Sequence, residues 1–231
     1  MLSEGFAHNI STNSDNSEDS VNFFMELLAV DETLDSMQTS QIIRSYNKIL
    51  GKVERLRENS KTDEQLLERL FYFTHRGLKH YKTNAKFSAI FLSGDYDCVT
   101  STALYGLLLK KLDFRFDIIE FPFHTLLIVH VNGRPILFDG TDPIGGFITD
   151  KDQVNERILS YQTDAGQITF DQESFKKINL KNLIGLQFYN LSVESFNKRD
   201  YSQSKKLLED AYFFYPSPRI KELSRYISLS E

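Results

Sequence analysis

Residues 94–109 read G-D-Y-D-C-V-T-S-T-A-L-Y-G-L-L-L, and residues 122–143 read P-F-H-T-L-L-I-V-H-V-N-G-R-P-I-L-F-D-G-T-D-P. The first stretch begins with a turn, and Asp95 or Asp97 can cap the helix that follows. Apolar residues occur on every side of this helix, which predicts a buried helix rather than an amphipathic surface helix. Cys98, the only cysteine of the chain, is therefore expected at the N-terminus of a buried helix.

The start of a helix suits a nucleophilic cysteine. A thiol attacks a carbonyl as the thiolate, and it needs a base within reach. Unpaired N–H groups and the positive end of the helix dipole favour a negative charge at this position. Lys110 and Lys111 end the helix with the charge that the dipole prefers there. Asp97 acts in the other direction, because a carboxylate directed at the sulfur would disfavour the thiolate.

The second stretch predicts a β-hairpin. Asn132-Gly133 between two apolar runs is the strongest short-range signal for a two-residue type I′ turn. With that turn, His124 and Asp139 lie on the same face as diagonal neighbours, with Cα atoms roughly 7–8 Å apart. Asp142 falls on the opposite face, so Asp139 is the better residue to orient the imidazole. A bulge or a three-residue loop would reverse this choice.

This order of residues resembles the transglutaminase-like superfamily, whose papain-like fold carries a Cys-His-Asp triad on a helix and two strands. The resemblance covers about residues 85–148. It implies that Cys98 is the nucleophile, that His124 is the general base and then acid, and that Asp139 orients the imidazole. It also implies a thiol-dependent hydrolase or acyl transferase that acts on a peptide or amide substrate and uses no cofactor.

The sequence departs from the family at the oxyanion site. Papain-like enzymes use a glutamine a few residues before the cysteine, whereas residues 87–96 contain neither Gln nor Asn. The backbone N–H of Cys98 is one expected donor, with Tyr96 or Asn84 as the second. The alternative is a catalytically silent transglutaminase-like protein that serves as a protein- or peptide-binding module.

The other histidines are expected to have structural roles. His130 shares a strand face with His124 and is expected at the rim near the turn. His75 and His80 are five residues apart and fall on different faces of a predicted helix. Because none of the usual tight ligand pairs, such as C-x-x-C or H-E-x-x-H, occurs in the sequence, no metal site is expected. Gly145-Gly146 is interpreted as a flexible turn at the edge of the cleft.

Composition narrows the classes of partner. A chain of 231 residues can form one core with a small appendage, and a net charge of −5 without a dense Lys/Arg patch argues against nucleic acid and anionic membranes. No apolar run reaches the length of a membrane span, and the given chain has no signal-peptide pattern. A single cysteine excludes an internal disulfide. A cytoplasmic location is the default expectation, with export of a processed precursor left open.

Hydrophobic periodicity predicts an α+β fold in which the cysteine helix packs on a small antiparallel sheet between N-terminal helices and a C-terminal helical hairpin. Residues 1–20 are expected to be a disordered leader, and residues 21–180 to form the transglutaminase-like domain. Within that domain we expect helices from residue 21, at 39–58 and 62–80 before the cysteine helix, and near 152–160. Strands are expected at 117–121, in the hairpin and at 167–170.

Residues 181–231 are predicted to be helical. The segment from Leu183 to Tyr215, which precedes Pro216, resembles one tetratricopeptide unit, and residues 221–229 would cap it. A plain helical hairpin that completes the core is the equal alternative. Because a single unit cannot bury its own apolar face, we expect the hairpin to pack on the preceding domain. The same helices are the candidate surface for a protein partner.

Overall fold

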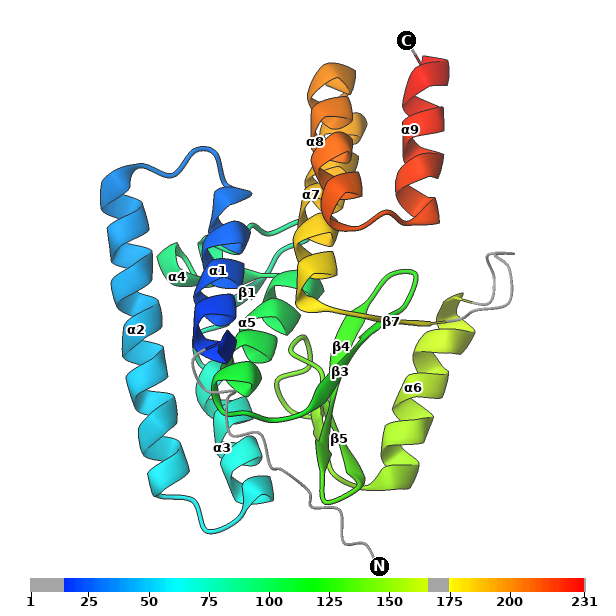
Figure 1. Cartoon of the computed structure of the whole chain (residues 1–231). Helices are drawn as coiled ribbons and strands as arrows, with labels where there is room; N and C mark the ends of the chain where they lie inside the picture. Colours follow the sequence, from blue (N-terminus) through cyan, green and yellow to red (C-terminus); the bar gives the residue numbers. More distant parts are fainter. Residues whose placement is uncertain (1–14, 166–174, 231) are drawn as a thin grey trace, which may run out of the picture.

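The computed structural model describes residues 15–165 and 175–230 as a mixed α+β protein, with helices on both faces of a small antiparallel sheet (Figure 1). Its elements follow in the order α1 (Asp15–Ala29), α2 (Ser36–Glu58), α3 (Asp63–His75), β1 (His80–Tyr81), α4 (Ala89–Leu92), β2 (Asp95–Tyr96), α5 (Cys98–Lys111), β3 (Phe116–Glu120), β4 (Thr125–Val131), β5 (Arg134–Phe138), β6 (Phe147–Ile148), α6 (Lys151–Ala165), β7 (Lys176–Ile178), α7 (Leu180–Asn197), α8 (Tyr201–Phe214) and α9 (Pro218–Ser230).

The hairpin of β4 and β5 forms with the register that the sequence predicts. The main sheet has the order β6-β5-β4-β3-β7, and all neighbouring strands in it are antiparallel. Val131 pairs with Arg134 across the turn, where Asn132 and Gly133 have φ values of 50° and 76°. Positive φ at both central residues is the signature of a type I′ turn. This register places residues 124 and 139 on one face of the hairpin.

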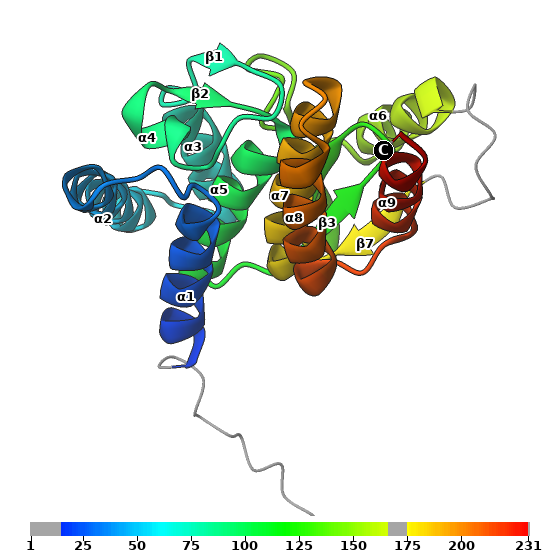
Figure 2. The same ribbon diagram turned by 90° about the horizontal axis from the view of Figure 1, so that it is seen from above.

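Helices cover the two faces of the sheet separately. Leu127 and Val129 of β4 belong to the main core that the sheet shares with α5, whereas Leu126 and Ile128 pack with Val154 of α6. The alternation follows from the two-residue period of a strand. In Figures 1 and 2, α5 and α7 lie on one side of the sheet and α6 lies on the other. The face that carries positions 124 and 139 is therefore the face beneath α6.

The cysteine helix α5 is buried as its sequence predicts. Every residue from Val99 to Leu109 is buried, whereas Cys98 at the first position is only half-buried. Gly106 allows α7 to approach closely, because a Cβ atom there would lie 2.7 Å from a methyl carbon of Leu180. An apolar helix in the middle of the molecule thus brings its first residue to the end of the sheet.

Several elements differ from the prediction. Helix α1 begins at Asp15, inside the predicted leader, because an established helix extends at one hydrogen bond per added residue even through polar sequence. Helix α3 ends at His75 rather than at residue 80, and His80 instead begins a short strand that pairs with β2. The strand predicted at 167–170 lies outside the described residues, while the short edge strand β7 was not predicted.

The C-terminal helices pack on the preceding residues as part of one core. Leu183 and Ile184 of α7 are fully buried in the cluster that also contains the α5 side chains. Ser192 of α7 and Ser204 of α8 exchange hydrogen bonds of 2.9 Å with each other's backbone carbonyl, which fixes the two helices against each other. Across the described ranges, none of the helices has both the length and the apolar character that a membrane crossing requires.

Candidate active site

Cys98 is the first residue of α5, and Asp97 caps the helix. The Asp97 carboxylate accepts the N–H of Thr100 at 2.8 Å, and the Thr100 hydroxyl accepts the N–H of Asp97 at 2.9 Å. Burial raises the pKa of Asp97 to about 6, against the effect of these N–H donors. The Asp97 carboxylate therefore points to the backbone at the start of the helix, although Asp97 is adjacent to Cys98 in sequence. The capping box uses the N–H groups of Asp97 and Thr100 and not that of Cys98.

His124 is held directly before β4 by a tight turn and by α5. The N–H of Phe121 donates to the His124 carbonyl at 2.8 Å, across the turn that contains Pro122. On the next residue, the Thr125 carbonyl accepts a 3.1 Å hydrogen bond from the Thr102 hydroxyl of α5. Thr102 lies one helical turn after Cys98. This hydrogen bond therefore links α5 to β4 close to both Cys98 and His124.

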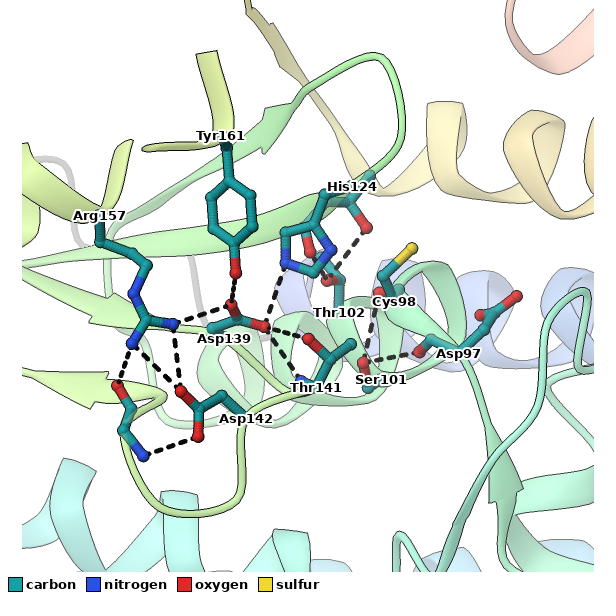
Figure 3. Close-up of polar contacts among 12 residues, drawn as sticks. Asp97, Cys98, Ser101, Thr102, His124, Asp139, Thr141, Asp142, Arg157 and Tyr161 are labelled. Carbon is teal, nitrogen blue, oxygen red and sulfur yellow. Dashed lines mark hydrogen bonds and ion pairs between the residues drawn. The ribbon is translucent and has the colours of Figure 1, made fainter. Parts of the chain in front are cut away.

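The structure brings His124 and Asp139 together. His124 Nε2 lies 3.1 Å from Asp139 Oδ1, and the Asp139 side chain has no solvent exposure (Figure 3). The same oxygen accepts the N–H of Thr141 at 3.0 Å and its hydroxyl at 2.7 Å. These donors hold the carboxylate in one orientation. Because Nε2 faces Asp139, Nδ1 is the ring nitrogen that remains for Cys98.

Tyr161 of α6 closes the site from above the sheet. Its hydroxyl donates to Asp139 Oδ2 at 2.5 Å, and its ring lies 4.5 Å from the His124 ring, centroid to centroid (Figure 3). Arg157, one turn earlier in α6, places Nη1 3.6 Å from the same carboxylate oxygen. Sequence reasoning named neither residue: it ended this helix at residue 160, before Tyr161, and had no signal that the helix crosses the sheet face that carries Asp139. The available signal was their four-residue spacing, which puts them on one helix face.

The electrostatics of the site favour a charged imidazole. Burial lowers the pKa of His124, but its hydrogen bonds to Asp139 and Cys98 and the charges of both groups outweigh this effect and raise the pKa to about 9. Burial acts to raise the pKa of Asp139, and its hydrogen bond and charge interaction with His124 instead hold the pKa well below its ordinary value. At neutral pH the pair is therefore an imidazolium beside a carboxylate, with the thiol as the third member.

The side chains of Asp142 and His130 have partners other than His124 and Cys98. Asp142 accepts the N–H groups of Ile144 and Gly145 through Oδ1, and Arg157 through Oδ2, so it shapes the loop after β5. His130 Nε2 lies 2.9 Å from Asp117 at the surface. Among residues 15–165 and 175–230, no group of three or more His, Cys, Asp and Glu side chains is arranged to hold a metal ion.

The two expected oxyanion residues lie in different surroundings. The buried ring of Tyr96 packs edge-on against the rings of His75 and Tyr81. Asn84 follows β1 in a left-handed conformation with φ of 61°, which is typical of a turn residue. Two further polar residues approach this end of α5. Burial and the charges of Cys98 and Asp97 raise the pKa of Tyr81 to about 12, and Asn190 of α7 hydrogen-bonds Asp97.

The turn after Asp139 is tightly packed rather than flexible, and it gives a matched pair of variants. A Cβ atom on Gly146 would lie 2.1 Å from the Asp139 carbonyl oxygen, so Gly146→Ala should lower the free energy of unfolding by about 2 kcal/mol or more. At Gly145 a Cβ atom would meet only the ends of the Asp142 and Arg157 side chains, and Gly145→Ala should cost less than about 1 kcal/mol. Urea denaturation measures both values, and equal losses would contradict the packing described here.

Comparison of the chain with protein-family models, with curated proteins and with solved structures finds no match. The functional argument therefore rests on the geometry of Cys98, His124 and Asp139.

Proposed function

We propose that this protein is a thiol-dependent hydrolase or acyl transferase with a papain-like core of the transglutaminase-like type, acting on a peptide or amide. The observation that carries the proposal is the arrangement of the sole cysteine at a helix N-terminus beside a buried imidazole–carboxylate pair. A free cysteine with only a packing role is usually an inert small hydrophobe. Such a role would not require a histidine that is 12 % exposed and held by a fully buried aspartate.

The proposed reaction begins with the Cys98 thiolate and the His124 imidazolium. Sulfur attacks the substrate carbonyl carbon, and the Cys98 N–H stabilises the negative charge that develops on the carbonyl oxygen. The tetrahedral intermediate collapses as the C–N bond breaks, and His124 Nδ1 gives its proton to the leaving amine. The product of this half-reaction is a thioester on Cys98, with a neutral imidazole next to it.

Water or an amine then resolves the thioester. Neutral His124 removes a proton from the attacking oxygen or nitrogen, the new bond to the acyl carbon forms, and the C–S bond breaks to restore the thiolate. Asp139 stays ionised throughout and keeps Nε2 protonated, so that Nδ1 is presented to sulfur. Hydrolysis is the simpler second step because water needs no acceptor site of its own.

The second candidate function is a catalytically silent protein- or peptide-binding module. It is favoured by one observation, the absence of Gln and Asn from residues 87–96, where papain-like enzymes carry their oxyanion glutamine. A binding module would keep the fold and the hydrogen bonds of Asp139, but it would form no covalent intermediate.

Intact-mass spectrometry with a small activated ester separates the two functions. The full chain is mixed with p-nitrophenyl acetate, and the reaction is quenched in acid at short times and after the ester is consumed. The enzyme should gain one acetyl group at early times and lose it later, while Cys98→Ala gains none. Absence of the adduct in the wild-type protein, or an adduct that is never released, would favour the binding module.

A further inference from the structure

Glu120, the last residue of β3, is buried next to the C-terminal helices. Only 3 % of its surface is exposed, and a carboxylate in such a position requires partners that compensate for lost hydration. One oxygen accepts a hydrogen bond from the hydroxyl of Tyr215, the residue that directly follows α8. The other lies 3.1 Å from Nη2 of Arg219 in the first turn of α9. Both partners therefore come from the C-terminal helices, about 95 to 99 residues after Glu120.

Arg219 also contacts the backbone that leads to His124. The same Nη2 donates to the carbonyl oxygens of Phe121, at 3.5 Å, and Pro122, at 3.3 Å. The guanidinium lies over the ring of Tyr189 at 5.6 Å, which gives it a further support on α7. In Figure 1 the start of α9 lies next to the turn between β3 and β4. One side chain thus holds three consecutive residues, the last of which is two positions before His124.

The turn is short enough to transmit a displacement to the imidazole. Pro122 has a fixed φ, and the N–H of Phe121 closes the turn on the His124 carbonyl at 2.8 Å. The ring of His124 must keep Nε2 at Asp139 while Nδ1 faces Cys98. A movement of about 1 Å in a positioning element can change a reaction rate by about 100-fold.

We propose that Arg219 is a positioning residue for His124, and that Arg219, Glu120 and Tyr215 form a clamp through which the C-terminal helices hold the histidine turn. The clamp does not touch Cys98 or a substrate. It gives the C-terminal helices a role at the active site besides that of completing the core. The catalytic consequence of this inference rests on the proposed function, whereas the effect of the clamp on His124 does not.

The titration of His124 in the full chain tests the clamp, and the sign of the change is diagnostic. The imidazole can be followed by NMR and assigned with His124→Gln. Removal of a nearby positive charge, with Glu120 left unpaired, would raise the pKa of His124 through space. If the clamp positions the ring, Arg219→Gln should instead lower that pKa from about 9 by about one unit, because the ring moves away from Asp139 and Cys98.

Three further variants complete the experiment. Arg225→Gln removes an exposed arginine from the same helix and should titrate as the wild type does. Arg219→Lys keeps the charge but lacks the planar guanidinium, so its shift should be intermediate. Tyr215→Phe removes only one hydroxyl and should show a smaller fall, which keeps the test available if Arg219→Gln does not fold. Each titration is recorded at a temperature below the midpoint of thermal unfolding of that variant, so that the folded protein is observed.

An unchanged or raised pKa of His124 in both Arg219→Gln and Tyr215→Phe would overturn the clamp. A wild-type protein that forms no acyl adduct would instead overturn the proposed function and leave the titration result intact. The two failures are therefore distinguishable.

Discussion

Replacing His124 with alanine should lower kcat for release of the acetyl group from Cys98 by about 10²- to 10⁴-fold, the usual contribution of a general acid–base residue. The reason is local, since His124 Nε2 lies 3.1 Å from the buried Asp139 carboxylate and the pKa of the imidazole is raised by Cys98 as well as by Asp139. Measurement of the adduct lifetime by quenched-flow mass spectrometry gives the rate constant directly. The fold should persist, because the His124 side chain lies at the end of a strand rather than in the main core.

His130→Ala is the matched control for this variant. His130 lies in β4, six residues after His124, and its side chain is 42 % exposed and pairs with Asp117. An exposed ion pair of this kind contributes about 1 kcal/mol or less to stability. The adduct lifetime should therefore be that of the wild type. Equal losses in His124→Ala and His130→Ala would show that the hairpin, and not the imidazole of His124, is responsible.

Asp139→Asn should lower kcat by about 10²- to 10⁴-fold and leave the shape of the site nearly unchanged. An asparagine amide can still accept from Thr141, but it carries no charge to stabilise the imidazolium and can fix the wrong tautomer of His124. The pKa of His124 should consequently fall below its wild-type value of about 9. Steady-state kinetics and an NMR titration of His124 measure the two effects.

Asp142→Asn provides the control, because it changes the other carboxylate of the same loop. The amide oxygen of the introduced side chain would still accept the N–H groups of Ile144 and Gly145, so the loop should keep its shape. Loss of its ion pair with Arg157 should affect kcat by less than about 3-fold, because that pair is partly exposed. A larger loss of kcat in Asp142→Asn than in Asp139→Asn would contradict the assignment of Asp139 as the orienting carboxylate.

The parts of the fold that depend on local sequence could be predicted. The Asn132-Gly133 turn determined the register of β4 and β5, and with it the common face of His124 and Asp139. The apolar run after Cys98 likewise predicted a buried helix with the thiol at its start. Each of these predictions used backbone preferences and a fixed period within about 15 residues.

The contacts between distant elements could not be predicted. Tyr161 and Arg157 reach Asp139 because α6 crosses the sheet face that carries the histidine, and nothing near residue 139 in sequence indicates this helix. Arg219 lies close to 100 residues after its partner Glu120, and only the packing of α9 brings them together. Side-chain contacts of this kind follow from tertiary packing rather than from propensity or periodicity.

The most direct test of the central claim is the rate of carbamidomethylation of Cys98 by iodoacetamide as a function of pH. Because Cys98 is the only cysteine, the total incorporation reports on this residue alone. An ordinary thiol, with a pKa of about 8.5, is largely unreactive at pH 6. The imidazolium of His124 persists from pH 6 to its pKa of about 9 and should stabilise the thiolate over that range.

We therefore expect the wild-type protein to react at pH 6 about 10- to 100-fold faster than His124→Ala, with little further increase toward pH 8. The rate of His124→Ala should rise steadily as the pH approaches about 8.5, as for a simple thiol. Slow alkylation at pH 6 with the same pH profile in both proteins would contradict the account, because Cys98 and His124 would then not form a thiolate–imidazolium pair.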